Sequence, residues 1–331
     1  MLRCGDCSAS RTASDRTLME GAMKLRPRRV LLDTNAAGSL YEPRQGRSAE
    51  DLAVVRDFLS DRVRNGSVQV VIAYRLLEEY APVQRSNLVR YTASLDYLQP
   101  LVGPHLLLPV DQLVEREARA RRRLRYHECV FDPATSEALW RLARSPEALD
   151  AAGPEIEEMK SDHEAQMVRQ RERAHEIYLE RKLGDTVVKK GDRVPALDEV
   201  TRAWGKQEMR KQIDAWTRDT LAQMIADRKL PPEAADLDPS AVPTLRAMNA
   251  YFMARIVQNV GHRARIRGSD LFDHYHFSSA VYADLLVSDD GDFTRTVKVI
   301  DDKFPIQSFE ELRASLRSGG CGPVADLGDQ R

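Results

Sequence analysis

The chain has 331 residues, a formal net charge of −1, 42% apolar residues and 31% charged residues, which fits a helix-rich globular protein with a sizeable core. This balance excludes a global positive field, so any surface for nucleic acid must be local. The sequence has no apolar run of the roughly 20 residues that a membrane helix needs, and its CxxC pair, Cys4 and Cys7, lacks the second pair of a zinc site. We therefore expect a cytoplasmic protein without a membrane segment.

The first 110 residues are predicted to contain a tail and then alternating strands and helices. Residues 1–26 are polar and predicted to be disordered, with Met23 as an alternative start. The predicted strands that follow are 30–32, 68–73 and 106–110, the last as a strand or an extended crossover, and the predicted helices are 52–63 and 74–98. Because apolar strands alternate with helices, residues 27–110 predict a parallel sheet covered on both faces.

Residues 111–240 are predicted to form a large α-helical insertion. The predicted helices are residues 114–126, 154–183 and 197–229. Acidic and basic residues balance in the two long helices, which favours a solvated surface with ion pairs four residues apart. The first helix is basic and contains Arg119, Arg121, Arg122, Arg123 and Arg125. This run favours a solvated helix face, and contact of Arg121 and Arg122 with phosphate is the alternative.

Residues 241–317 are predicted to form the second half of the core. The predicted helices are 241–260, one containing Asp270 and Asp273, one ending near Val299, and 309–316 capped by Ser308; the predicted strands are 283–287 and an edge strand at 304–307. Residues 318–331 are glycine-rich and are predicted to be a flexible tail. The expected fold class is therefore α/β, a three-layer α/β/α core with a parallel sheet and a large helical insertion.

Carboxylates recur at the ends of the predicted strands and on one helix face. They are Asp33 after the first strand, Glu78 and Glu79 after the second, Asp289, Asp290 and Asp292 after the strand at 283–287, and the helical pair Asp270 and Asp273. In open α/β sheets, ligands bind outside the carboxyl ends of the strands, so these groups are expected to meet there. Like charges that close repel one another unless a cation lies among them. Ligands that are all oxygen suit Mg²⁺ or Mn²⁺.

Two of these segments resemble a known family. The opening Val30-Leu-Leu-Asp-Thr-Asn35 is similar to the first strand of PIN-domain nucleases, and Leu285 to Phe293 resembles that family's closing strand and acidic turn. The edge strand followed by Ser308-Phe-Glu-Glu-Leu312 is similar to the family's ending. The resemblance covers residues 28–110 and 262–317, and the long insertion departs from the shorter members of the family.

The resemblance implies roles for particular residues. Asp33, Glu79, Asp273 and Asp290 match the catalytic, metal-binding acids, and Asp270 and Asp292 are accessory metal ligands. The supporting candidates are Asn35, Glu78, Ser288 and His276, and the nucleic-acid-binding candidates are Arg263, Arg265, Arg267, Arg121 and Arg122. A packed or hydrogen-bonded helix histidine is the commoner role for His276. Asp289 is expected to be a solvated turn residue.

The function implied by the resemblance is a metal-dependent nuclease, an endoribonuclease acting on single-stranded or structured RNA with Mg²⁺ or Mn²⁺ as cofactor. The alternative is a non-catalytic PIN-like scaffold or regulatory protein that binds a protein partner through the helical insertion. A third hypothesis, a phosphohydrolase for small phosphate esters, lacks its nucleophilic DxD, because the chain has Asp33-Thr34-Asn35 after the first strand. RNA against DNA as substrate, and monomer against homodimer, stay open at this stage.

Overall fold

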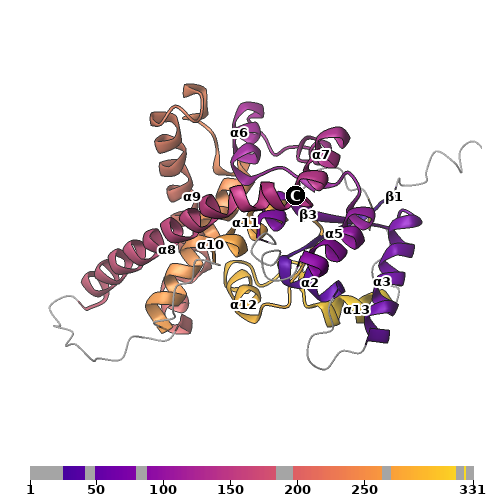
Figure 1. Ribbon diagram of the computed structural model, residues 1–331. Coiled ribbons are helices and arrows are strands. Elements are labelled where there is room, and N and C mark those ends of the chain that lie inside the picture. The colour runs from indigo at the N-terminus through magenta and orange to yellow at the C-terminus, as the bar shows by residue number, and fades with distance from the viewer. Residues whose placement is uncertain are drawn as a thin grey trace, which may run out of the picture.

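A five-stranded parallel sheet lies at the centre of the protein. The computed structural model describes residues 25–41, 49–79, 88–183, 197–262, 270–317 and 324–325 (Figure 1). The strands are β2 (Arg28–Leu32), β3 (Val68–Ala73), β4 (Leu106–Leu107), β5 (Leu285–Val287) and β6 (Ile306–Gln307). Their order across the sheet is β4-β3-β2-β5-β6, and all four pairings are parallel. The α/β class and the parallel sheet are thus confirmed.

Helices cover both faces of this sheet. One face carries α2 (Thr34–Tyr41), α3 (Ala49–Arg64), α5 (Leu88–Val102) and α13 (Phe309–Arg317); the other carries α6 (Val110–Ala120), α10 (Pro243–His262), α11 (Asp270–Ser279) and α12 (Gly291–Ile300). Successive strand residues point to opposite faces, so Val30 and Leu32 pack in the first layer while Leu31 packs in the second. All three are fully buried, which contributes roughly 1.5–3 kcal/mol each. The strands are apolar on both sides for this reason.

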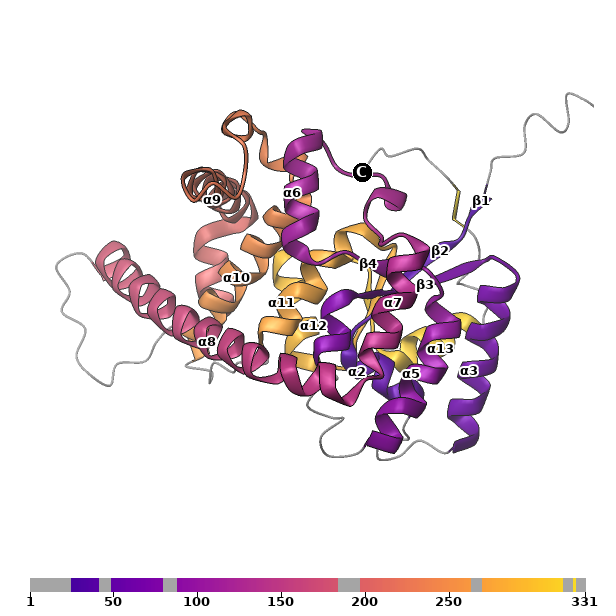
Figure 2. The same ribbon diagram turned by 45° about the horizontal axis from the view of Figure 1, so that its top comes forward.

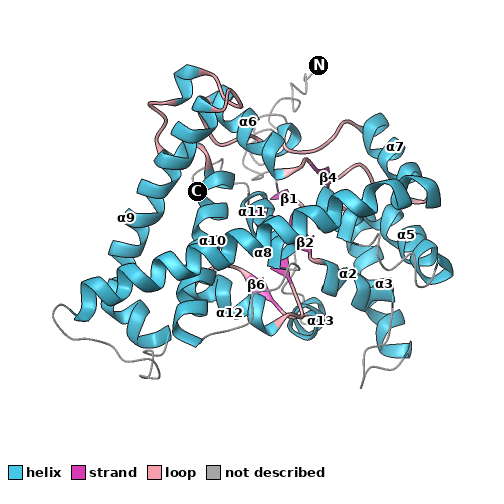
Figure 3. Cartoon of the chain, turned by 60° about the vertical axis from the view of Figure 1, so that its left-hand side comes forward, coloured by secondary structure: helices cyan, strands magenta, loops and turns pink. Residues whose placement is uncertain are grey.

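The predicted insertion contains α7 (Pro133–Ala143), α8 (Pro146–Leu183) and α9 (Leu197–Ala226). Figures 2 and 3 show α8 starting beside α7, crossing α10 and projecting beyond the rest of the protein. Part of this segment belongs to the core around the sheet, because Trp140 and Ile156 are buried in the first layer and Leu113 in the second. The segment after residue 110 is therefore packed into both layers as well as extending from them.

Local contacts define the ends of two helices, and the predicted Ser308 cap is confirmed. Gly66 ends the turn after α3 with a φ of +73°, a conformation that glycine adopts without strain. The capping box of α13 is present: Ser308 Oγ accepts from Glu311 N at 3.2 Å, and Glu311 Oε2 accepts from Ser308 N at 2.7 Å. β6 is an edge strand, as the sequence predicts.

Two predictions about local structure are wrong. The basic helix expected at 114–126 instead begins at Val110 and ends at Ala120, because Arg121 adopts a left-handed conformation with a φ of 55° and its N–H bonds to the carbonyls of Ala118 and Glu117. Residues of both predicted tails also pair, since β1 (Leu25–Arg26) lies antiparallel to β7 (Val324–Ala325). The other residues of the two tails lie outside the described ranges. Among the described residues, none of the helices has the length and apolar character needed to cross a bilayer.

Candidate functional site

The candidate site lies at the carboxyl ends of β2 and β5, the two central neighbours in the sheet. The chain leaves β2 for β3 on one side and leaves β5 for β6 on the other, so the crossovers diverge at this point. Such a divergence opens a crevice in which open α/β sheets bind ligands. Leu32 is paired with Val287, which places Asp33 beside Ser288, and Asp33 N donates to Val287 O at 3.1 Å.

Asp33 is the most enclosed acid of the site. Its side chain is 2% exposed, and its Oδ1 accepts from Ala36 N at 2.6 Å in the first turn of α2. Burial raises the pKa of Asp33 to about 6, although the charge of His276 and a hydrogen bond from the Ser288 hydroxyl oppose this rise. Asp33 is therefore held in one orientation and ionises less readily than an ordinary aspartate.

Asp273 lies on α11, and its pKa is raised both by burial and by the negative charges of nearby acids. Burial raises its pKa well above the usual range of an aspartate. The further causes are the negative charges of Asp290, Glu79, Asp270 and Asp33. In the part of the chain that the structure describes, its carboxylate has no hydrogen bond or ion pair. The negative charges of four other acids thus act on a carboxylate that no described cation neutralises by direct contact.

Glu79 joins the site through a small hydrogen-bonded group. The Thr34 hydroxyl donates to Glu79 Oε2. His276 Nε2 lies 3.1 Å from Thr34 Oγ1 and 3.2 Å from Glu79 Oε2. The His276 side chain is 1% exposed, and its Nδ1 has no hydrogen-bond partner among the described residues. Three elements are therefore tied together here: α2, the helical residues 74–79 and α11.

Asp290 reaches the site as the N-cap of α12. Its Oδ1 accepts from Asp292 N at 2.8 Å and from Phe293 N at 2.9 Å. Asp290 Oδ2 accepts no hydrogen bond from the described residues, and Asp290 is the first of the charges that raise the pKa of Asp273.

Four other predicted acids have different partners. Glu78 forms a close ion pair with Arg75, and Asp270 forms a buried one with Arg255 at 2.6 Å. Asp292 is exposed and lies 3.3 Å from Arg295, outside the group around Asp273. Asp289 is not the solvated turn residue that was expected: it accepts from the Ser39 hydroxyl at 2.9 Å and from Phe309 N at 2.9 Å, so it joins α2 to the start of α13.

Of the remaining predicted supporting and nucleic-acid-binding residues, one lies at the site, two are paired elsewhere in the protein, and three lie outside the described residues. Asn35 lies half-buried in the first turn of α2, next to Thr34. Arg121 donates to the carbonyl of Glu233, and Arg122 forms a bidentate pair with Glu128 at 2.9 and 2.8 Å, so both have partners within the protein. The remaining candidates, Arg263, Arg265 and Arg267, lie outside the described residues.

Comparison with known proteins leaves the site to be interpreted from its own geometry. No protein family, curated protein or solved structure matches this chain.

The donor chemistry of the site fits a hard divalent cation. Asp33, Glu79, Asp273 and Asp290 offer oxygen alone, which suits Mg²⁺ or Mn²⁺. A cation among them would reverse the repulsion that raises the pKa of Asp273. However, within the described ranges no three His, Cys, Asp or Glu side chains are already grouped so as to hold a metal ion. Binding therefore requires the acids to turn toward one another from the positions that their present hydrogen bonds define.

Proposed function

We propose that this chain is a metal-dependent nuclease, an endoribonuclease that hydrolyses phosphodiester bonds in RNA. The observation that carries the proposal is the Asp273 carboxylate, which lies among other acids at the switch point of a parallel sheet with no described cation bonded to it. Strongly perturbed acids in such a crevice mark candidate catalytic sites. Asp33, Glu79, Asp273 and Asp290 are the proposed holders of Mg²⁺ or Mn²⁺.

The residues of the chain have separate tasks in this proposal. A bound divalent cation supplies activation of water and stabilisation of the leaving oxygen. Ser288 and Ala36 hold Asp33 in place, and the backbone N–H groups of α12 hold Asp290. Thr34 and His276 orient Glu79 by hydrogen bonds to its Oε2. Among the described contacts, Glu79 Oε1 accepts no hydrogen bond and is the oxygen that would bind the metal. Partners of this kind orient metal ligands.

The test is cleavage of end-labelled single-stranded RNA by the full chain with Mn²⁺, with and without EDTA. We expect Asp33→Asn and Asp290→Asn to lower the rate by more than about 100-fold, because loss even of the outer partners of metal ligands costs about 10- to 100-fold. Asp292→Asn is the matched control, since that acid is exposed and paired with Arg295. Equal cleavage by wild type and all variants, or cleavage that EDTA leaves intact, would refute the proposal. A parallel DNA substrate tests the choice of RNA.

A second candidate function is a non-catalytic scaffold that binds a protein partner through α8 and α9. The observation that favours it is the lack of a ready coordination group in the described part of the chain. Titration calorimetry with Mn²⁺ separates the two hypotheses. Saturable binding that Asp273→Asn abolishes supports the nuclease, whereas no heat of binding supports the scaffold.

A further inference from the structure

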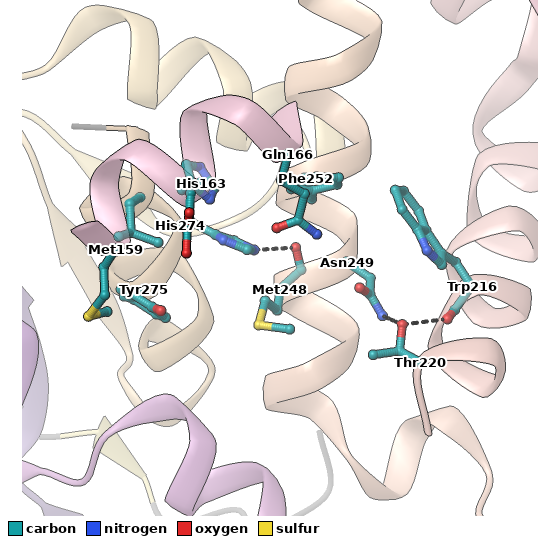
Figure 4. Close-up of a pocket in the computed structure, with 12 residues that line it drawn as sticks. Met159, His163, Gln166, Trp216, Thr220, Met248, Asn249, Phe252, His274 and Tyr275 are labelled. Carbon is teal, nitrogen blue, oxygen red and sulfur yellow. Dashed lines mark hydrogen bonds between the residues drawn. The ribbon is translucent and has the colours of Figure 1, made fainter. Parts of the chain in front are cut away.

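A cavity of about 410 Å³ lies where α8, α9 and α10 converge on α11. Its size falls in the range of small-ligand sites, roughly 300–1,000 Å³. Figure 4 shows side chains from these helices gathered around it, among them Trp216, Phe252 and Tyr275. None of the described residues that line it is an arginine or a lysine. The cavity is therefore lined by aromatic, apolar and polar side chains, Asp162 among them, and has no described cation to attract a phosphate or a carboxylate.

Asn249 offers the cavity a fixed hydrogen-bond acceptor. The hydroxyls of Thr217 and Thr220 donate to the carbonyls one turn earlier in α9, at 2.8 and 2.9 Å. Both hydroxyl oxygens are consequently left to accept from Asn249 Nδ2, each at 3.3 Å. Figure 4 shows the amide nitrogen turned toward Thr220. This arrangement sets the orientation of the amide and leaves Asn249 Oδ1 without a hydrogen bond from the described residues.

His274 offers a second acceptor. Its Nε2 lies 2.8 Å from the carbonyl of Met248, which can only accept, so Nε2 carries the hydrogen. A neutral imidazole with hydrogen on Nε2 has a lone pair on Nδ1. His274 Nδ1 is therefore an acceptor without a partner among the described residues.

His163, on α8, lines the cavity and can either donate or accept a hydrogen bond. Its side chain is 7% exposed, lines the cavity and has no hydrogen bond within the described part of the chain. Its ring lies 5.7 Å from that of His274 and 6.2 Å from that of Phe252. Burial lowers the pKa of His163 to about 4, so this ring is also neutral and donates from one nitrogen or the other as a ligand requires. Buried polar groups are normally hydrogen-bonded, so a ligand in the cavity would supply a partner for this ring.

We propose that this cavity binds an uncharged nucleobase that carries an exocyclic amino group, of the adenine or cytosine type. The aromatic walls fit the faces of a planar ring, and stacking of a base on aromatic side chains favours binding. The two acceptors, Asn249 Oδ1 and His274 Nδ1, fit the hydrogens of an amino group. The phosphates of a nucleotide would stay outside, because no described cation lines the cavity.

This base has two sources, a free nucleoside or a nucleic-acid strand. The strand source rests on the proposed nuclease function and deepens it. Asp273 and His274 are neighbours on α11, one among the acids and the other in the cavity. A strand that places a base in the cavity would therefore pass close to the acids. The free nucleoside does not depend on the nuclease proposal.

The first arm of the test is titration calorimetry of the full chain with nucleosides in EDTA, so that no metal takes part. We expect adenosine or cytidine to bind, and we expect purine riboside, which is adenosine without its amino group, to bind about tenfold more weakly than adenosine. His163→Leu and Trp216→Leu should each weaken binding by about tenfold. His127→Leu is the matched control, because that histidine is exposed and outside the cavity; its affinity should stay within about twofold of wild type. Circular dichroism checks that each variant is folded.

The second arm replaces the nucleoside by a hexamer of the same base, again in EDTA. If the base comes from a strand, the hexamer binds more tightly than the nucleoside and His163→Leu weakens both by a similar factor. If His163→Leu affects only the nucleoside, the ligand is a free nucleoside. Absence of binding by both adenosine and cytidine, or binding that is equal in all variants, overturns the proposal. Nucleoside binding without any metal-dependent cleavage would refute the nuclease function alone, and cleavage without nucleoside binding would refute the cavity proposal alone.

Discussion

Asp273 is a side chain that lowers the stability of the metal-free protein when ionised and that would bind a divalent cation. Its carboxylate is half-buried on α11, and its pKa is raised by burial and by the acids around it. A carboxyl whose pKa is higher in the folded than in the unfolded state supports folding fully at pH values below the unfolded pKa. That support is lost as the pH rises through the folded pKa. At alkaline pH the ionised group therefore destabilises the metal-free protein.

The first prediction is that Asp273→Asn raises the free energy of unfolding of the metal-free protein at pH 8 by about 0.5–2 kcal/mol, because the amide carries no charge. At pH 3 the difference should be small, since the carboxyl is then largely protonated in both states. The same substitution should abolish binding of Mn²⁺. Urea denaturation at both pH values and calorimetry with Mn²⁺ check this prediction. A variant that is less stable than wild type at pH 8, with Asp292→Asn unchanged as the control, would contradict it.

The site could be predicted from the sequence only as far as its acids. Asp33 and Asp290 follow apolar strands, and a parallel sheet necessarily brings such strand ends to one edge. Thr34 was not anticipated as a bonding partner, and the commoner role given to His276, a hydrogen-bonded histidine, is what the structure shows. The bond between Thr34 and Glu79 joins residues 45 positions apart, and no local pattern encodes such a contact. The same applies to Asp289, whose partners lie on two separate helices.

At the scale of elements, α6 is attached to α10 by a buried acid. Glu117 is fully buried and accepts hydrogen bonds from the Thr244 hydroxyl at 2.6 Å, from Thr244 N and from the Tyr282 hydroxyl. Burial raises the pKa of Glu117 from 4.5 to about 7, even though these hydrogen bonds oppose the rise. Since the folded-state value is the higher one, the associated stability is present below pH 4.5 and is lost as the pH rises through about 7.

The second prediction is that Glu117→Gln flattens the dependence of stability on pH. One unit of pKa is worth about 1.4 kcal/mol, so the loss of unfolding free energy between pH 5 and pH 8 should be smaller in the variant by about 2–3 kcal/mol. Urea denaturation at the two pH values measures it. Glu115→Gln is the control on the same helix, because Glu115 is exposed and paired with Arg119. An unchanged pH dependence in Glu117→Gln would show that this acid is not the group that titrates.

The ends of the elements show where sequence patterns were sufficient and where they were not. The Ser308 cap and the Gly66 turn were predictable because each depends on residues within one turn. The end of α6 was not, since the arginine run continues the helical pattern while Arg121 leaves it with a positive φ. Arg121 donates to the carbonyl of Glu233, a contact from far along the chain. The tertiary contact accompanies a backbone conformation that local propensity disfavours.

At the scale of the whole molecule, the long helical segment and the sheet share one hydrophobic core. Trp140, on α7, is 1% exposed and packs with residues of β2, β3 and α5. Tyr91, on α5, donates to the carbonyl of Ala143 at 2.7 Å and so joins the same two regions. The helices of the segment from residue 133 onward are thus anchored where the first layer of helices meets the sheet.

The third prediction concerns this shared core. We expect Trp140→Ala to lower the free energy of unfolding by about 3–5 kcal/mol, because it removes a large, fully buried side chain. We also expect one cooperative transition by circular dichroism and by tryptophan fluorescence, since the segment and the sheet share contacts. Leu142→Ala is the control on the same helix: this leucine is 53% exposed, and its removal should change stability by less than about 0.5 kcal/mol. Two separate transitions would contradict a common core.

Helix α11 connects the two proposed binding sites, the acids around Asp273 and the cavity lined by His274. It presents Asp273 to the acids and His274 to the cavity, and successive residues of a helix are about 100° apart around its axis. A small rotation of α11 therefore moves both side chains together. Occupation of either place would alter affinity at the other, and thermodynamic linkage requires the two effects to be equal in factor. Through this one turn of helix, the metal affinity of the acids would then depend on which base is bound in the cavity.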